Sequence, residues 1–449
     1  MSRHVVITGL GPTSAVGLGI EPTWQAALEG RTAIGPIESF DPSSFDCRIA
    51  AEIIGFRAQK YVPKWYRKAT KVMARDIGLA VAGADLAARD AGIKTRATTD
   101  NGEDRSYSSQ RMGAHIGAGL IAAELDELTS GLAEARDANG AFDIHQWGQE
   151  GMQHLTPLWL LKYLPNMLAC HVTILHDAQG PSNTITCTEA SAGLSLGESL
   201  RVIQRGDADM CFCGGADSKL NPTEFLRLLM TGRYNTTEED DPQLAARPFC
   251  QTAAGSIIGE GGAIVVLEAR DTFEQRRIRN KPTGYAEIVG FGAAQSINRN
   301  ARNLLPDPEG RGIDNAILIA IGEAGIDPQQ IDLVIPTGIG HPASDRAEVA
   351  ALKRVFGDYL SQLPVIPNKA LFGNCSAGAG GLDACIAAKA LAEQTLPAIV
   401  NCKQPWPELA GGTTAMRPAD LQYALICSCG LGGQIAALVL KRYDDNASS

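Results

Sequence analysis

The chain has 449 residues, of which 45% are hydrophobic and 20% are charged, so it can bury a large core. Its formal net charge of −10 excludes a general nucleic-acid binder, because contacts to a phosphate backbone require clustered Lys and Arg. Small molecules and protein partners remain possible ligands.

The chain opens with a strand signal, an apolar and β-branched run over residues 5–8 that ends at Gly9. No apolar stretch with a cleavage site precedes it, and Gly, Asp, Arg and Gln interrupt every later apolar segment. We therefore expect a cytoplasmic protein without a membrane span.

Short strands and Ala-rich helices alternate along the rest of the chain. The pattern predicts a helix over residues 70–91 and strands over residues 111–117, 210–213 and 263–267. This alternation is typical of an α/β fold with buried strands. Because no Pro/Ser-rich linker or low-complexity tract divides the chain, we expect one compact unit or two closely packed halves.

Two weak internal repeats favour two similar halves. A helix end and a glycine-rich strand within residues 88–119 resemble residues 323–340, and residues 259–268 resemble residues 430–440. Such a pattern predicts a duplicated α/β unit.

Cysteine and histidine placement gives no sign of a metal or a disulfide framework. None of the 11 cysteines forms a Cys-x-x-Cys pair, and several lie in apolar strand-like runs, so we expect buried free thiols. The 7 histidines include no i, i+4 pair, and no Gly-Lys-Ser/Thr follows the glycine-rich strand ends. The sequence therefore predicts no metal site and no cofactor.

Residues 180–199 predict a strand, a tight turn and then a helix. A turn of this kind exposes one side chain at a helix N-terminus, where unpaired N–H groups favour negative charge. The elbow suits a nucleophile or an anion binder. The alternative is simple helix capping by Thr188 or Ser191.

Further motifs accompany the elbow. They are the opening run over residues 5–17, Gly180-Pro-Ser, Gly206-Asp-Ala-Asp, Gly214-Gly-Ala, Arg247-Pro-Phe, Gly259-Glu-Gly and Ser428-Cys-Gly-Leu-Gly-Gly. In order and spacing, from the first strand to about Lys441, they resemble the β-ketoacyl-acyl-carrier-protein synthase family.

The resemblance implies a duplicated thiolase-like fold in five α-β-α-β-α layers. We expect residues 1–262 to form the N-terminal half, which carries the elbow, and residues 263–449 to form the C-terminal half. The resemblance also implies an acyl carrier protein as a partner. It further implies either a homodimer or a heterodimer with an active ketosynthase.

The family's chemistry uses a cysteine nucleophile, two histidines and a lysine. By resemblance these positions hold Glu189, Thr337, Asn374 and Lys369, with Asp345 and Glu348 nearby and Asp383 where the family has a glutamate. Ile339 and His341 replace the Thr-x-Thr pair that would hold pantetheine, and Leu431 replaces a gating phenylalanine. A carboxylate cannot form a stable thioester, and two oxyanion donors are missing, so ordinary condensation is not expected.

Two functional hypotheses follow, and both give Glu189 a role. In the first, the chain is a non-condensing partner subunit, similar to chain-length factors, in which glutamine replaces the cysteine. An ion pair between Glu189 and Lys369 would then only fill the site. In the alternative, an acyltransferase-family enzyme uses Glu189, Lys369 and His341 in altered chemistry on a carrier- or CoA-bound acyl group. A scaffold module without turnover is a third possibility.

A few other residues carry weaker hypotheses. A basic stretch comprises Lys60, Lys64, Arg67, Lys68, Lys71 and Arg75, to which Arg227 could add. It is either a solvated helix face or a docking patch for an acidic carrier protein, centred on Lys64, Arg67, Lys68 and Lys71. Cys187 is a reactive thiol or a buried strand residue, and we expect His171 to be a packed structural residue.

Overall fold

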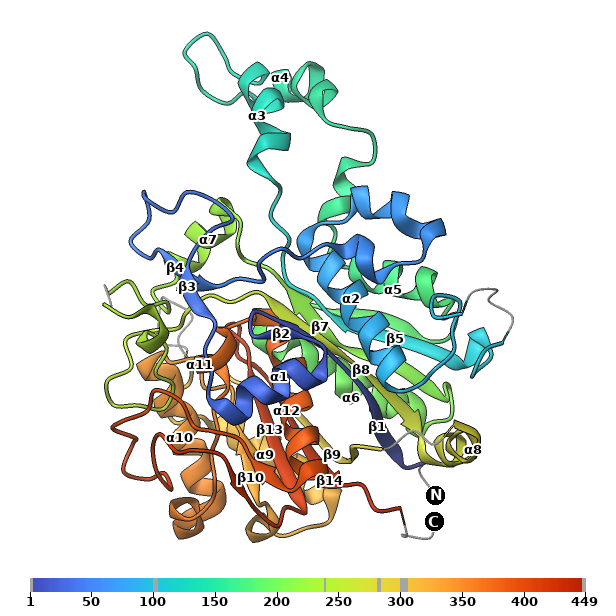
Figure 1. Ribbon diagram of the computed structural model, residues 1–449. Coiled ribbons are helices and arrows are strands. Elements are labelled where there is room, and N and C mark those ends of the chain that lie inside the picture. The colour runs from blue at the N-terminus through green and yellow to red at the C-terminus, as the bar shows by residue number, and fades with distance from the viewer. Residues whose placement is uncertain (1–2, 100–103, 238–239, 281–283, 299–305, 446–449) are drawn as a thin grey trace.

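The computed structural model describes residues 3–99, 104–237, 240–280, 284–298 and 306–445 (Figure 1). One ten-stranded sheet runs through the molecule. Its first part contains β1 (Val5–Ser14), β5 (Met112–Gly117), β6 (Ser182–Ile185), β7 (Met210–Asp217) and β8 (Gly261–Ala269). Its second part contains β9 (Ala286–Gln295), β10 (Leu333–Ile335), β13 (Tyr423–Cys429) and β14 (Gln434–Arg442).

The two parts repeat one strand pattern. The first has the order β6-β5-β7-β8-β1, and the second has the order β10-β13-β14-β9. In each part a parallel pair, β5 with β7 or β10 with β13, is followed by two antiparallel neighbours. The parts meet where β1 and β9 pair antiparallel, with Val6 opposite Glu287.

The internal repeats of the sequence fall on equivalent strands, so the predicted duplication is confirmed. β5 and β10 hold matching places, as do β8 and β14. The expected boundary between residues 262 and 263 stays a prediction, although strand order itself places β8 with the first part.

Helices form the remaining three layers of a thiolase-like α-β-α-β-α arrangement. The middle layer consists of α6 (Ser191–Gln204) and α12 (Ala379–Glu393), which contact strands of both parts. One outer layer holds α2 (Arg75–Asp90) and α5 (Met167–His176), and the other holds α9 (Arg311–Ala324) and α10 (Pro342–Phe356). Helix α12 is Ala-rich and buried along almost its whole length, which suits a helix covered on both sides.

Shorter elements join these layers. They are β2 (Gly17–Leu18), α1 (Ile20–Glu29), β3 (Ile34–Pro36), β4 (Ile49–Ala51), α7 (Pro222–Leu229), α8 (Arg270–Asn280), α11 (Lys369–Phe372), β11 (Thr395–Leu396) and β12 (Arg417–Pro418). Among the described residues, no helix combines the length and apolarity needed to cross a membrane. All 11 cysteines are free thiols.

The predicted strands are confirmed, but the predicted helix over residues 70–91 begins later, at Arg75. Residues Lys64–Val72 form a separate 3-10 helix, and Met73 and Ala74 have extended backbones between the two. Both side chains are buried in the core, so tertiary packing interrupts a pattern that local propensity would have continued.

One segment stands clear of the layers, and we call residues 124–163 the arm. It contains α3 (Leu125–Glu134), α4 (Ile144–Gln149) and the 3-10 turns Gly151–His154 and Trp159–Tyr163. Figure 1 shows α3 and α4 projecting beyond the rest of the molecule. No sequence pattern predicted this projection.

Candidate functional site

The elbow has the predicted strand–turn–helix geometry. After β6, Thr188 adopts a left-handed backbone with φ 47°, an uncommon conformation for a β-branched residue. Two hydroxyl groups hold the turn, because the Cys187 N–H donates to Ser191 Oγ at 2.8 Å and the Leu431 N–H donates to Thr188 Oγ1 at 2.8 Å. The turn thus presents Glu189 immediately before α6.

Glu189 is 2% exposed, and both of its carboxylate oxygens accept hydrogen bonds. Oε1 accepts from Arg233 Nη2 and from Asn374 Nδ2, each at 3.1 Å, and Oε2 accepts from the Leu431 N–H at 3.1 Å. Burial alone would raise the pKa of Glu189, but the Arg233 charge and the hydrogen bonds outweigh it and lower the pKa. The residue is therefore a well-coordinated anion.

Arg233 supplies the positive charge of this site, and it is not among the site residues predicted from the sequence. It is 6% exposed and follows α7, 44 positions after Glu189. Because a buried carboxylate requires a nearby cation, the glutamate at the elbow was the one available signal that such a residue existed. Nothing local identified which Arg or Lys it would be.

Lys369 is not the partner of Glu189, so that expected ion pair is wrong. Its Nζ forms a short ion pair with Asp383, and both side chains are at most 2% exposed. Asn368 Nδ2 also donates to Asp383, at 3.1 Å. Asp383, on α12, therefore neutralises the buried charge of Lys369, and Glu189 does not.

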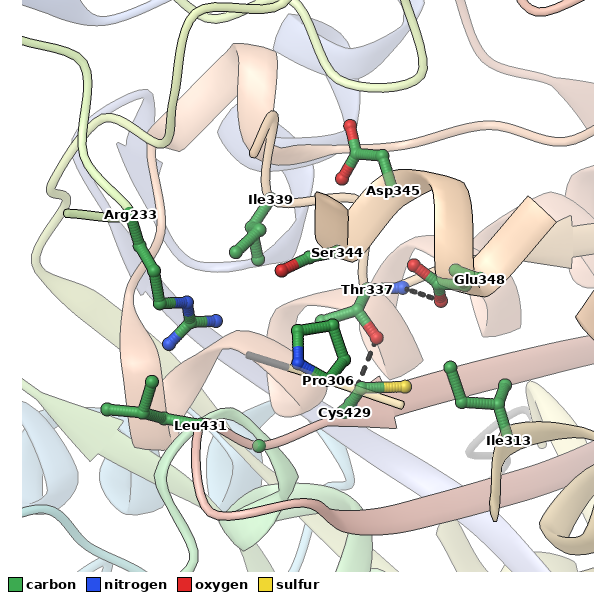
Figure 2. Close-up of a pocket in the computed structure, with 11 residues that line it drawn as sticks. Arg233, Pro306, Ile313, Thr337, Ile339, Ser344, Asp345, Glu348, Cys429 and Leu431 are labelled. Atoms are coloured by element: carbon green, nitrogen blue, oxygen red, sulfur yellow. Dashed lines mark hydrogen bonds between the residues drawn. The ribbon is translucent and has the colours of Figure 1, made fainter. Parts of the chain in front are cut away.

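The two positions assigned to histidines by resemblance are used structurally. The Thr337 N–H donates to Glu348 Oε1 at 2.7 Å, and its hydroxyl bridges the β13 backbone, donating to the Cys427 carbonyl at 3.3 Å and accepting from the Cys429 N–H at 2.9 Å (Figure 2). Asn374 donates to Glu189 and accepts from the Ser376 N–H at 3.0 Å.

The acids near Thr337 are buried and bind backbone N–H groups. Burial raises the pKa of Glu348, although its oxygens accept from Thr337 and Gly338. Burial, with a smaller contribution from Glu348, raises the pKa of Asp345 to about 8, against the effect of its bonds from the Phe249 and Gly340 N–H groups.

His341 is half-buried, and its Nδ1 lies 3.0 Å from Ser344 Oγ. Burial and the charge of Arg233 lower its pKa. Its hydrogen-bond partner is therefore a serine, and the hydrogen bonds of Glu189 and Lys369 go to other residues.

A small cavity of about 40 Å³ adjoins the site. Its lining residues are Arg233, Pro306, Ile313, Thr337, Ile339, Ser344, Asp345, Glu348, Cys429, Gly430 and Leu431. Figure 2 shows Arg233, Ile339 and Leu431 along one side and Thr337 and Glu348 along the other. Since one water needs roughly 10–15 Å³, the cavity has room for a few waters and none for a long acyl chain.

The weaker hypotheses about Cys187 and His171 have different outcomes. Cys187 is half-buried and burial raises its pKa, which disfavours a reactive thiolate. His171 is packed as predicted, with Nδ1 2.7 Å from Tyr66 Oη, and burial lowers its pKa to about 4.

Fewer basic side chains are available on the surface than the sequence of this stretch suggested. Lys60, Lys64, Arg67, Lys68 and Lys71 are exposed. Arg75, however, pairs with Glu260 at 2.6 Å between Nη2 and Oε1, and so lies outside the exposed set. Arg227 pairs with Glu224 at 3.3 Å.

Comparison with known proteins gives full-length matches. Residues 2–272 match the family model "Beta-ketoacyl synthase, N-terminal domain", and residues 285–403 match "Beta-ketoacyl synthase, C-terminal domain". The 3-oxoacyl-[acyl-carrier-protein] synthase 2 of Staphylococcus aureus is 28% identical over 445 residues, and that of Coxiella burnetii is 30% identical over 451 residues; each match covers 99% of both chains.

Solved structures share the fold. A β-ketoacyl synthase from Burkholderia phymatum is 25% identical, with a TM-score of 0.81 over 99% of this chain and 100% of that one. The ishigamide ketosynthase/chain length factor, at 24% identity, superposes with a TM-score of 0.81 over the same shares. A type II polyketide ketosynthase solved in complex with its acyl carrier protein, at 21% identity, gives 0.82, again over 99% and 100%.

Proposed function

We propose that this chain, which belongs to the β-ketoacyl synthase family, is a partner subunit that does not itself carry out cysteine-dependent condensation. The observation that carries the proposal is the state of Glu189. It is buried, ionised and hydrogen-bonded on both oxygens, and by resemblance it occupies the position at which the family has a cysteine thiol.

The chemistry of condensation has no substitute at this site. A carboxylate paired with Arg233 is a poor nucleophile and gives an anhydride where a thiol gives a thioester. An oxyanion would also need donors, and the Thr337 hydroxyl is bonded to backbone while the Asn374 amide is bonded to Glu189. Each missing donor is worth about 3 kcal/mol in transition-state stabilisation.

The alternative, acid–base chemistry by Glu189 and Lys369, receives less support. The lowered pKa of Glu189 makes it a weak base, and Lys369 is committed to Asp383. The adjoining cavity of about 40 Å³ is also too small to admit a long acyl chain without rearrangement. These points favour a filled, inactive site.

By analogy with the solved pair that includes a chain length factor, we propose that the chain forms a heterodimer with an active ketosynthase. We further propose that an acyl carrier protein docks on the exposed residues Lys64, Arg67, Lys68 and Lys71. Their lack of burial and uniform charge suit an acidic partner.

Reconstitution tests this function. The protein is mixed with acyl- and malonyl-carrier protein, with and without a ketosynthase from the same genome that keeps the cysteine, both histidines and the lysine. We expect condensation only in mixtures that contain that ketosynthase, with a rate or product length that changes when this chain is added. Condensation that is identical with and without this chain would contradict the partner role.

A further inference from the structure

Two buried cysteines that are far apart in the chain, Cys250 and Cys402, lie against each other. Cys250 follows the Arg247-Pro-Phe motif directly, and Cys402 lies in the segment between β11 and β12. The Cys402 Sγ lies 3.5 Å from the Phe249 carbonyl oxygen, which belongs to the peptide unit that leads into Cys250. The two thiols also interact with each other directly. They are therefore a pair, and the proposed function gives neither of them a role.

Backbone contacts hold the two segments together independently of the sulfur atoms. Cys250 and Pro405 form an isolated antiparallel bridge, and beside it the Gln251 N–H donates to the Gln404 carbonyl at 2.8 Å. A disulfide forms without distortion only where the backbone already holds two cysteines within reach of each other. This bridge, with the contact of Cys402 described above, supplies that condition.

The pair is covered by a thin layer of the protein. Cys250 is 0% exposed and Cys402 is 2% exposed, but exposed residues follow each of them directly, namely Gln251 and Thr252, and Lys403 and Gln404. A small local opening of either segment would therefore admit a small, uncharged oxidant.

The backbone in front of each cysteine is strained. Phe249 has φ 58° and Asn401 has φ 61°, both in the left-handed region. That region is costly for a side chain as large as phenylalanine, and residues held there cluster at functional and switching segments. Both cysteines thus follow a turn that the surrounding structure has to enforce.

The two thiols differ in acidity. Burial alone would raise the pKa of Cys250, but hydrogen bonds with Thr252, the Gln404 backbone and Cys402 outweigh it and lower the pKa. The Thr252 Oγ1 lies 3.1 Å from the Cys250 Sγ. Burial, with a contribution from Cys250, raises the pKa of Cys402 to about 12. Because the thiolate is the nucleophile, Cys250 is the attacking member of the pair and Cys402 the resolving member.

We propose that Cys250 and Cys402 form a reversible redox site, which a hydroperoxide oxidises to an intramolecular disulfide. The Cys250 thiolate attacks one oxygen of hydrogen peroxide and breaks the O–O bond, which leaves a sulfenic acid and a hydroxide that takes up a proton to become water. The Cys402 sulfur then attacks the Cys250 sulfur, breaks its S–O bond and releases a second water that carries the Cys402 proton. The two sulfurs lose two electrons, and the peroxide gains them. A dithiol restores both thiols by exchange.

The bond would join two segments at the edge of the candidate site. The Phe249 N–H donates to Asp345 Oδ2 at 2.8 Å, and Asp345 lines the cavity that adjoins Glu189. Oxidation of Cys250 therefore fixes one wall of that cavity. The redox site does not depend on the proposed function, because it is measured on the thiols themselves.

Peptide mapping of the full-length protein tests the proposal. The chain is reduced with dithiothreitol, treated with hydrogen peroxide at pH 7, blocked with an alkylating reagent and digested with trypsin. Cys250 is the one cysteine of the tryptic peptide 234–270, and Cys402 is the one cysteine of the peptide 390–403, so mass spectrometry identifies the bond without ambiguity.

We expect these two peptides to be joined and to be lighter by two hydrogens than their reduced sum. Two of the 11 free thiols should be lost and should return with dithiothreitol. The oxidised protein should also unfold at a higher temperature than the reduced protein, because the bond restricts the unfolded chain.

Three variants assign the roles. Cys402→Ser should stop at the sulfenic acid, which dimedone labels on Cys250, whereas Cys250→Ser should give neither the label nor the cross-linked peptides. Cys170→Ser is the matched control, since it removes a half-buried thiol outside the pair, and it should form the bond at the wild-type rate. In wild type, peroxide should consume Cys250 about tenfold faster than Cys170 or more. Circular dichroism verifies that each variant is folded.

Three results would overturn the proposal: wild-type protein without the joined peptides, peroxide oxidation that falls on Cys170 or Cys187 instead, or loss of two thiols at the wild-type rate in Cys250→Ser. The first two need no variant, so a variant that fails to fold leaves the test intact. A chain that condenses alone would refute the proposed function and leave the redox site standing, whereas thiols that never pair would refute only the redox site.

Discussion

Glu189 and Arg233 form a buried ion pair whose members depend on each other. Arg233 is 6% exposed and Glu189 is 2% exposed, so removing one charge leaves the other in a low-dielectric environment without its counter-ion. The pair is supported by Asn374, which donates to the same Glu189 oxygen as Arg233 does. The site is therefore stable as it stands and poorly suited to exchanging a proton with a substrate.

The Glu189→Gln variant should be less stable at pH 7 by about 3 kcal/mol, because Arg233 would stay charged and unpaired. Glu189 has a lowered pKa in the folded protein, so its contribution is present above the unfolded pKa of about 4.3 and is lost as pH falls further. Urea unfolding at pH 7 and at pH 3.5 should thus show a difference between wild type and variant that shrinks at the lower pH.

The control for that measurement is Arg31→Gln, which breaks the exposed Arg31–Glu29 pair. It should leave the unfolding free energy almost unchanged, because solvent screens an exposed ion pair. The double variant Glu189→Gln with Arg233→Gln should recover part of the loss. If Glu189→Gln unfolds with the same free energy as wild type, Glu189 and Arg233 do not form a buried ion pair.

Asp345 should make stability fall as pH rises. Its pKa is raised to about 8, so between about pH 4 and pH 8 the folded state holds a proton that the unfolded state has lost. Unfolding free energy should decrease across this window by at most about 1.4 kcal/mol per pH unit from this group. Asp345→Asn should remove that slope. It should also cost some stability, because the amide oxygen can accept from only one of the Phe249 and Gly340 N–H groups and the amide nitrogen cannot accept from the other. Equal slopes would contradict the assignment.

At the scale of elements, the site depends on the close approach of α6 to β5. A Cβ on Gly117 would lie 2.7 Å from the Ala192 nitrogen and 2.7 Å from the Ser191 carbonyl carbon, both backbone atoms at the start of α6. The helix cannot come this close to a strand that carries a larger residue. The glycine at the end of β5 therefore sets the position of the elbow.

Gly117→Ala should destabilise the protein by about 2–3 kcal/mol, because the backbone of α6 must move to admit the methyl group. Gly322→Ala is its opposite: Gly322 is exposed on α9, and nothing lies within 4 Å of the added Cβ. That change should stabilise by about 0.5–1 kcal/mol through helix propensity. Thermal unfolding of the two variants should give shifts of opposite sign, and a shift of the same sign in both would contradict this packing.

Local patterns predicted these elements well where the element is regular. The strand starting at Val5, the glycine-ended strands and the turn at Thr188 all follow from short-range periodicity and turn chemistry. The start of α2 was missed because the extended backbones of Met73 and Ala74 follow from burial, which no local window records.

Contacts between segments that are distant in the chain could not be predicted, for a different reason. The pairing of Lys369 with Asp383 and of Glu189 with Arg233 depends on how distant segments meet, and charge type alone allowed the wrong choice. The arm was missed because its apolar residues point outward, whereas periodicity arguments assume that apolar faces point into the same chain's core.

For the whole molecule, the duplicated architecture supports a site in which Glu189, Thr337 and Asn374 stand at the cysteine and histidine positions of the resemblance. Two matching sets of strands, with α6 and α12 between them, bring the elbow of the first part against Thr337, Asn374 and Leu431 of the second. The fold therefore stays well packed although every reactive position of the resemblance except Lys369 has changed. The exposed residues Lys64, Arg67, Lys68 and Lys71 are then the part of the surface where the proposed carrier protein would dock.

Carbon dioxide release from malonyl-carrier protein tests the central claim most directly, because decarboxylation needs the oxyanion donors but no second subunit. Wild-type protein alone is incubated with carboxyl-labelled malonyl-carrier protein, and release is compared with a buffer control and with Glu189→Gln. We predict release at the buffer rate for both proteins. Release by the wild-type chain well above buffer, abolished in Glu189→Gln, would contradict the account and make Glu189 a catalytic residue.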